Sequence, residues 1–343
     1  MIVSILTTCS LGIVSVFIMR KILSRKRIIC DCCSSIVGHA VITGSTSGIG
    51  LATARELARR NWTVTLACRD VHSAKQVKQS IATETRNLKI NVEPLDLSSR
   101  DSIDGFTAKM STTPIHVLVN NAGVMASSPQ LSSSFGNVDI DTATNYLGPF
   151  YLTQSLMPSL KLTCDSQTFY PRVIFVESSL AKQGSVEQLF RPWPEQAVWN
   201  TSQQYANSKM ALCLYARELH SQLGSLSDGV IYTYSLFTGG MVDTQLSRHV
   251  LSTYPSILRR IFRLLSKLFL QSPETACNTV VHCAVSPNVP GAHLSSECYN
   301  GHPSGCGMLY SNCTPIEWPP MMQDLSKAHQ LFNDTRKHLG LTS

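Results

Sequence analysis

The sequence has few charged residues for its length and no segment of simple composition. Charged side chains make up 15% of the 343 residues, against 43% that are hydrophobic, which excludes a disordered or fibrous chain. Neither an internal repeat nor a second domain is evident. The length suits one α/β domain of about 250 residues or more with a short appendage. We therefore expect a single well-filled core.

Neither the charge nor the cysteines indicate a nucleic-acid or metal partner. The formal net charge is +7, but the cations are dispersed except at two places, Arg20–Arg27 and Arg259–Lys267, both in or beside apolar segments. Such clusters favour anionic lipid headgroups over nucleic acid. Twelve cysteines are present, yet no pair of histidines completes a zinc pattern. We therefore expect reduced structural or lipid-modified thiols and no metal site.

An uncharged segment opens the chain and predicts a membrane anchor over residues 1–28. Ile2–Met19 carries no charge, and five cations follow within Arg20–Arg27. A cleaved signal peptide has its cations on the other side of the apolar run, and no small-residue cleavage site follows. The positive-inside rule then predicts a catalytic domain facing the cytosol, and we expect the endoplasmic reticulum membrane. Because the run is near the minimum for spanning about 30 Å of hydrocarbon, a shallow or re-entrant anchor is the alternative.

Glycosylation sequons provide a test of this orientation. If the domain faces the cytosol, the sequons carry no glycan. They lie at Asn61, Asn200, Asn312 and Asn333.

Beyond residue 36, short β-rich apolar runs alternate with longer helical patterns. This order predicts a parallel sheet with crossover helices, a doubly wound Rossmann fold that forms one domain over residues 37–343. The runs are continuously hydrophobic, as expected for strands covered by helices on both faces. The strands are expected at His39–Thr43, Thr63–Ala67, Asn91–Leu95, Val117–Asn120, Val173–Val176 and Val230–Leu236.

A glycine-rich turn follows the first expected strand and precedes an amphipathic stretch. Glycines there allow a tight turn and let backbone N–H groups approach a pyrophosphate at a helix N-terminus. A plain strand-to-helix connection is the alternative for such a turn taken alone. The turn consists of Gly44, Ser45, Thr46, Ser47, Gly48, Ile49 and Gly50.

Further motifs follow in an order that resembles the short-chain dehydrogenase/reductase family over roughly residues 37–315. Asn120–Gly123 ends the fourth strand, Ser178 and Ser179 follow the fifth, and Tyr205–Lys209 lies in the next helix. Three other segments resemble the retinol-dehydrogenase-like branch of that family: Ala67–Asp70, Asn145–Gly148 and Gly307–Cys313.

Tyr205 and Lys209 also form a catalytic pair on physical grounds. Residues at i and i+4 share one face of a helix, so the ammonium is expected to favour the ionised phenol and to lower its pKa toward neutral pH. A phenol tuned in this way is a competent general acid or base. An ordinary pair on a helix surface is the alternative.

The resemblance implies roles for the remaining site residues. Tyr205 would exchange a proton with the substrate oxygen, Ser179 would hydrogen-bond that oxygen, and Asn145 would support a proton-relay water. A structural asparagine at a helix kink is the alternative for Asn145. The implied cofactor contacts are the seven residues of the glycine-rich turn, Arg69, Asp96, Leu97, Asn121, Ala122, Gly123, Tyr205, Lys209 and Thr244. For Asp96, capping the turn before Ser98 and Ser99 is the alternative.

The cofactor is expected to be NADP(H), with NAD(H) as the alternative. Arg69 follows the second strand, where an acidic residue would bind the 2′-hydroxyl of NAD and a cation suits a 2′-phosphate. The neighbouring Asp70 weakens that preference. Two other departures from the family pattern are Gly239-Gly240, where the branch has Pro-Gly, and Glu177, which either opposes negative charge on the substrate oxygen or points away from the site.

The segment Tyr254–Leu270 is expected to form a basic amphipathic helix over the substrate entrance. A core helix with solvated cations is the alternative. Three aromatic residues in the insertion Lys182–Gln203, namely Phe190, Trp193 and Trp199, either line the pocket or anchor the loop. The sequence thus predicts an oxidoreductase for lipophilic alcohols and carbonyls of retinoid, polyprenoid or sterol type. The alternatives are a membrane-bound scaffold that keeps the nucleotide site and a secreted carbonyl reductase. A homodimer is implied by the resemblance alone.

Overall fold

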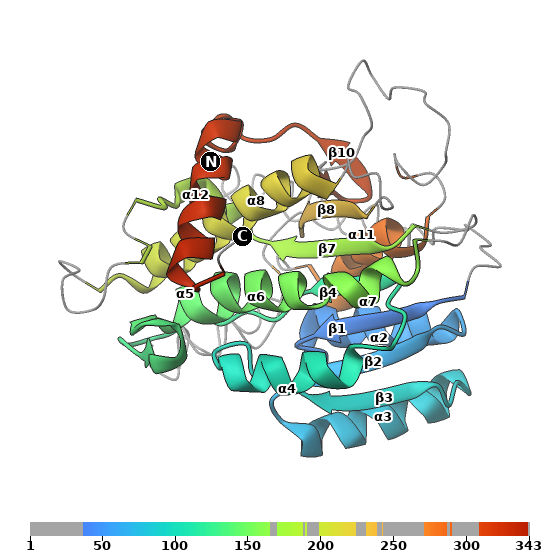
Figure 1. The fold of residues 1–343 in the computed structure, drawn as a ribbon. Helices are drawn as coiled ribbons and strands as arrows, with labels where there is room; N and C mark the ends of the chain where they lie inside the picture. The colour runs from blue at the N-terminus through green and yellow to red at the C-terminus, as the bar shows by residue number, and fades with distance from the viewer. Residues whose placement is uncertain are drawn as a thin grey trace, which may run out of the picture.

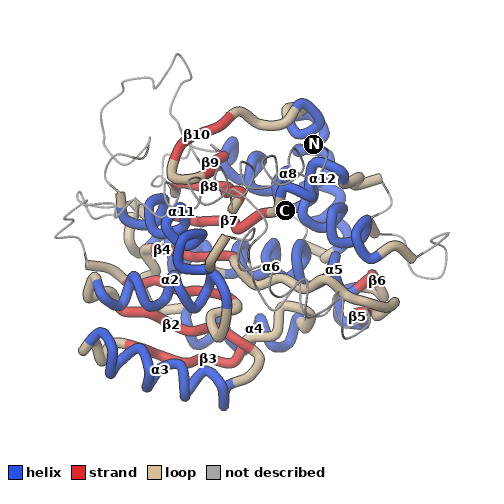
Figure 2. The backbone as a smooth tube through the Cα atoms, turned by 180° about the vertical axis from the view of Figure 1, so that it is seen from behind, coloured by secondary structure: helices blue, strands red, loops and turns tan. Residues whose placement is uncertain are grey.

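Figure 1 shows the fold in a computed structural model of the chain, and Figure 2 shows it from behind. The structure describes residues 37–164, 170–187, 189–190, 199–223, 231–238, 242, 271–286, 289 and 309–341. The predicted anchor at 1–28, the basic helix expected at 254–270 and the predicted cofactor contact Thr244 lie outside the described residues. Among the residues that are described, no helix is both long enough and apolar enough to cross a membrane.

A sheet of eight described strands forms the centre of the protein, in the order β10-β9-β8-β7-β4-β1-β2-β3. Neighbouring strands are parallel except β9 and β10, which pair antiparallel at one edge. The parallel sheet expected of a Rossmann-like fold is therefore confirmed. The strands are β1 His39–Thr43, β2 Thr63–Cys68, β3 Ile90–Pro94, β4 Val117–Asn120, β7 Arg172–Glu177, β8 Tyr232–Phe237, β9 Leu309–Ser311 and β10 Thr314–Ile316. A separate small hairpin pairs β5 Leu131–Ser132 with β6 Val138–Asp139.

Helices cover both faces of the sheet (Figures 1 and 2). One face packs against α2, α3 and α11, and the other packs against α4, α6 and α8, with α12 lying against α8. The longer helices are α2 Gly48–Arg59, α3 Val71–Thr85, α4 Arg100–Met110, α6 Gly148–Ser155, α8 Thr201–Leu223, α11 Pro273–Val285 and α12 Leu325–His338. The short ones are α5 Ile140–Thr142 and α7 Met157–Lys161, with a π turn at Ala143–Leu147 and 3-10 turns at Ser133–Phe135, Ser179–Gln183 and Pro320–Met322.

The central strands are hydrophobic throughout because each feeds two cores. In β1, Ala40 and Ile42 belong to the core beneath α2 and α11, while Val41 belongs to the core beneath α8. All three side chains are fully buried, since successive residues of a strand point to opposite faces. Burial of Val41 or Ile42 contributes roughly 1.5–3 kcal/mol. This two-sided burial explains why continuous apolar runs located the strands.

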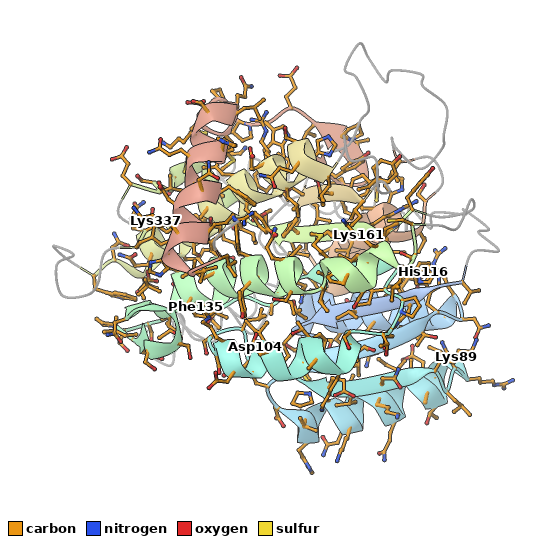
Figure 3. All side chains as sticks on the ribbon, viewed as in Figure 1. Lys89, Asp104, His116, Phe135, Lys161 and Lys337 are labelled. Atoms are coloured by element: carbon orange, nitrogen blue, oxygen red, sulfur yellow. The ribbon has the colours of Figure 1, made fainter. Side chains whose placement is uncertain are left out.

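The helix α12 anchors the outer side of the catalytic half. Phe332 packs on Phe150 of α6 with ring centroids 5.3 Å apart, and Thr335 shares a hydrogen bond with Tyr146 of the π turn. At the C-terminal end of α12, the His338 ring lies 3.0 Å from the carbonyl oxygen of Phe135, which Figure 3 labels near that helix end. These contacts hold α6 and the π turn in place from outside, although sequence patterns did not identify α12.

Candidate active site

The glycine-rich turn between β1 and α2 is shaped by steric demands that only glycine meets. Gly44 has φ +65°, a left-handed conformation that other residues rarely adopt. A Cβ on Gly50 would lie 2.4 Å from the carbonyl oxygen of Gly44 and 2.5 Å from the Asn121 amide nitrogen. The start of α2 is therefore drawn tightly against the end of β1.

The ends of β1 and β4 are tied together behind this turn. The Thr43 hydroxyl accepts the backbone N–H groups of Asn121 and Ala122, each at 3.0 Å. The Asn121 side chain donates to the carbonyl oxygens of Thr43 and Gly44, at 2.9 and 3.2 Å. In a doubly wound sheet the strand order reverses between these two strands, and ligands bind in the crevice outside that point.

The residues at this point fit the diphosphate of a dinucleotide. Ser47 precedes α2 but makes no side-chain capping hydrogen bond, and the first turn of the helix holds no acidic residue. The first N–H groups of α2 are thus left for an anion. The Ser45 hydroxyl is fully buried without a hydrogen-bond partner in the described structure. Thr46, the third hydroxyl of the turn, is half-buried.

The adenosine end of the crevice is marked by Arg69, an exposed residue directly after β2. Its neighbour Asp70 is engaged elsewhere, because its carboxylate caps α3 by accepting the Ser73 N–H at 3.0 Å and the Ser73 hydroxyl at 2.5 Å. The capping hydrogen bonds hold the pKa of Asp70 below its ordinary value. Arg69 forms no ion pair with any described residue.

Asp96 adopts the turn-capping arrangement that the sequence left as an alternative. One of its carboxylate oxygens accepts both the Ser98 N–H at 2.9 Å and the Ser98 hydroxyl at 2.6 Å. Leu97 is buried, and its carbonyl oxygen lies 2.2 Å from where a Cβ on Gly148 would stand. This segment therefore fixes the start of α6.

Tyr205 and Lys209 lie one turn apart on α8, as expected, and both are buried, with 6% and 3% of their surface exposed. The Lys209 ammonium donates to the carbonyl oxygen of Val176 in β7 at 2.9 Å. It also lies near Gly123, where an added Cβ would come within 3.6 Å of the Lys209 nitrogen. Gly123 thus keeps open the space in front of the ammonium.

The serine whose side chain interacts with Tyr205 in this structure is Ser178, while the substrate contact predicted for Ser179 stays a prediction. The Ser178 side chain hydrogen-bonds the Tyr205 hydroxyl, and its oxygen also accepts the Leu180 N–H at 3.3 Å. Ser179 is exposed and begins the following 3-10 turn. Strand β7 extends through Glu177, which pairs with Phe237, so Ser178 is the first residue after the strand.

The acidity of Tyr205 also differs from expectation. Burial raises the pKa of Tyr205 above its ordinary value, the hydrogen bond from Ser178 lowers it, and the carboxylates of Glu177 and Asp141 raise it further. The prediction that Lys209 lowers this pKa is therefore wrong for this structure. Burial, which the helix spacing does not reveal, is the largest cause of the rise.

Asn145 lies in the π turn and braces the loop that carries Gly123. Its amide oxygen accepts the Val124 N–H at 2.7 Å, and its nitrogen donates to the Val124 carbonyl at 2.8 Å and to the Ser208 hydroxyl at 3.0 Å. Isolated π turns occur frequently at functional sites. The side chain thus links this loop to α8 at a helix irregularity, as the structural alternative requires, while the proton-relay role of Asn145 stays a prediction.

Sequence reasoning missed Asp141, a second buried carboxyl group beside Tyr205. One of its oxygens accepts the Ala126 N–H at 2.9 Å, and the other is buried with no hydrogen-bond partner among the described residues. Burial raises the pKa of Asp141 to about 7, and nearby Asp139 adds to the rise. The sequence gives one signal for Asp141: it lies four residues before the predicted site residue Asn145, and residues at that spacing share one face of a helix.

The remaining predicted features are only partly described. Gly239, Gly240 and Trp193 lie outside the described residues. Phe190 stacks on the His338 ring with centroids 4.8 Å apart, and Trp199 donates to Thr201 at 3.2 Å. Phe190 therefore contacts α12, which is the second of the roles considered for it, whereas the Trp199 contact stays within the insertion.

Known proteins are similar to this chain in sequence and in fold. Residues 38–255 match the family described as short chain dehydrogenase. The chain is 33% identical to retinol dehydrogenase 11 of Homo sapiens, covering 82% of this chain and 83% of that protein. It is 35% identical to polyprenol dehydrogenase of Mus musculus, covering 74% and 72%.

Solved structures support the same fold. The structure resembles the 3-ketoacyl-(acyl-carrier-protein) reductase of Brucella melitensis complexed with NADH, with TM-score 0.55, 20% identity and coverage of 80% and 96% of the two chains. It also resembles a short-chain dehydrogenase of Sphingobium yanoikuyae in complex with NADPH, with TM-score 0.52, 16% identity and coverage of 71% and 83%. On the family match and these relatives, the chain belongs to the short-chain dehydrogenase/reductase family and is an NAD(P)-dependent oxidoreductase acting on CH–OH groups.

Proposed function

We propose that this enzyme interconverts a lipophilic alcohol and its aldehyde or ketone, of retinoid, polyprenoid or sterol type, with NADP(H). The observation that carries the proposal is the meeting of Ser178, Tyr205 and Lys209 at the carboxyl end of β7, beside a turn suited to a diphosphate. Relatives named retinol dehydrogenase and polyprenol dehydrogenase support a lipophilic substrate. We also propose that, within the retinol-dehydrogenase-like branch, the chain is similar to the membrane-anchored member named for the X chromosome.

In the proposed mechanism, Tyr205 acts as general acid in carbonyl reduction and as general base in alcohol oxidation. Ser178, rather than Ser179, hydrogen-bonds the substrate oxygen together with Tyr205 and stabilises the charge that develops there. Lys209 orients the ribose next to the nicotinamide from the space that Gly123 leaves open. Asn145 positions this loop through its two hydrogen bonds with Val124. When bound, the nicotinamide supplies or accepts the hydride.

A preference for NADP(H) over NAD(H) rests on Arg69. Its guanidinium is exposed after β2 and has no acidic partner among the described residues, while Asp70 is engaged as the cap of α3. A free guanidinium can bind a 2′-phosphate bidentately, whereas a capping carboxylate is not directed at a ribose. The glycine-rich turn would hold the rest of the dinucleotide together with Asp96, Leu97, Asn121, Ala122 and Gly123.

The proposed location is the endoplasmic reticulum membrane, with residues 1–28 as anchor and the catalytic domain in the cytosol. Membrane lipids would then contact the segment at 254–270, and a homodimer is proposed from the family alone. The sequons at Asn61, Asn200, Asn312 and Asn333 are all exposed, so an enzyme in the lumen would be open to glycosylation there. Glycosidase treatment of the protein from cells should leave its mobility unchanged, whereas a mobility shift would place the domain in the lumen.

The experiment that tests the activity uses the full chain in lipid nanodiscs beside Tyr205→Phe. NADPH and NADH absorbance is followed with retinal, polyprenals, sterol ketones and short aldehydes. We expect turnover of at least one lipophilic carbonyl, lost in Tyr205→Phe while cofactor binding persists. Binding of nucleotide without any turnover would instead favour a scaffold that keeps the fold, and a folded chain that binds no nucleotide would refute both readings.

A further inference from the structure

Glu177 is a buried carboxyl group for which the proposed mechanism has no use. It ends β7, 3% of its surface is exposed, and neither carboxylate oxygen has a nitrogen or oxygen hydrogen-bond partner in the described structure, where the Cys213 thiol of α8 is the polar side chain that interacts with it besides Lys209. A buried charge without partners is costly, so such a group is retained only where its neighbours stabilise it or where it acts on them.

The side chain of Glu177 lies on the catalytic side of the sheet. Val173 and Phe175, two and four residues earlier in β7, belong to the core beneath α8, and side chains along a strand alternate. Glu177 therefore faces α8, where it interacts electrostatically with Lys209 and Cys213. The Lys209 ammonium is held at 2.9 Å on the carbonyl of Val176, the residue that precedes Glu177.

The charged groups around the Tyr205 phenol come from three of the described elements. Glu177 from β7 and Asp141 from α5 interact electrostatically with Tyr205, and Lys209 of α8 interacts electrostatically with Glu177. Burial raises the pKa of Glu177, which Lys209 opposes, and burial lowers the pKa of Lys209, which Glu177 opposes. Each group therefore favours the charged form of the other, although no direct ion pair joins them in the described structure. Burial keeps the Cys213 thiol neutral by raising its pKa.

We propose that Glu177 is a positioning residue that neutralises Lys209 behind Tyr205, keeps the phenol protonated, and makes the enzyme a carbonyl reductase at neutral pH. In that reaction the Tyr205 O–H bond breaks and its proton goes to the carbonyl oxygen. The carbonyl carbon takes up hydride from NADPH, which is oxidised, and the phenolate regains a proton from water. Oxidation of the alcohol needs the phenolate first, so it is confined to alkaline pH. This inference rests on the proposed function of the same site.

The test is Glu177→Gln, which removes the negative charge and keeps the volume. With an unopposed ammonium behind it, Tyr205 should ionise at least about one pH unit lower than in the wild type. When alcohol oxidation is assayed at neutral pH, Glu177→Gln should therefore be about tenfold faster than the wild type, because one pH unit corresponds to a factor of ten. The matched control is Glu274→Gln, an exposed glutamate on α11 across the sheet, which should leave both quantities unchanged.

A second readout needs no substrate. Near-ultraviolet difference absorbance between each chain and its Tyr205→Phe counterpart reports the Tyr205 phenolate, over the pH range in which circular dichroism is constant. The inference is overturned if the wild type and Glu177→Gln have identical Tyr205 titrations, or if neither forms a phenolate. It is also overturned if the titration shifts while the pH dependence of alcohol oxidation stays unchanged. If the glutamine variant does not fold, Glu177→Ser makes the same change of charge. A wild type inactive on every substrate refutes the proposed function, while the titration still decides the role of Glu177.

Discussion

The choice between two adjacent serines gives the sharpest prediction, because the chain contains its own control. Ser178 donates to the oxygen of Tyr205 from the end of β7, whereas Ser179 is exposed on the next turn. Removal of one donor aimed at a developing oxyanion costs about 10²–10³ in kcat. We therefore expect Ser178→Ala to lower kcat roughly 100-fold, about 2.7 kcal/mol in activation free energy. Ser179→Ala should stay within about twofold of wild type, since it loses no buried contact.

The assay is steady-state reduction of the best carbonyl substrate, with kcat and KM for substrate and NADPH measured separately. Ser178 also accepts the Leu180 N–H, so its loss removes a cap worth at most about 1 kcal/mol, which thermal unfolding will reveal. Ser178→Thr keeps the hydroxyl and should restore most of the activity. If Ser179→Ala proves the inactive variant while Ser178→Ala turns over normally, the register of β7 inferred from this structure is wrong.

Two further changes follow from groups already described. Arg69→Gln should raise the KM for NADPH about tenfold, because one bidentate phosphate contact is lost, and should leave the KM for NADH nearly unchanged. Equal effects on the KM values of both cofactors would contradict an NADP(H) preference. Asp141 has a pKa raised from 3.8 to about 7, so the folded state loses stability as pH rises from about 4 to 7, by up to about 4 kcal/mol. Asp141→Asn should flatten this decline in urea unfolding across that pH range, while a decline equal to that of wild type would assign it to other groups.

The fold was largely predictable because its strands are buried on both faces. Runs such as Ala40–Ile42 and Val173–Val176 are apolar without alternation, and each proved to be a strand that feeds two cores. The elements that escaped prediction are β9 and β10, each of three residues, and α12. Three residues are too few to separate a strand from any short apolar run, and α12 exposes most of its length with only a narrow buried stripe.

The site was predictable where the chemistry is local and not where it depends on register or on distant charge. The glycine turn and the spacing of Tyr205 to Lys209 are visible in sequence, and both adopt the expected arrangement. The doublet of Ser178 and Ser179 is ambiguous, because a one-residue extension of a strand decides which hydroxyl faces α8. The acidity of Tyr205 depends on Asp141, more than sixty residues away in the chain.

The strand order has a consequence for how the protein is made on the ribosome. Outward from β1, the sheet adds β2 and then β3 on one side, and β4, β7, β8, β9 and β10 on the other, so position in space follows order of synthesis on both sides. Each newly translated strand meets a template that is already in place, which suits folding during translation. Any chain that stops early leaves a bare row of N–H and C=O groups, a surface prone to aggregation. Growth ends at β10, where Pro315 offers no N–H to a further strand.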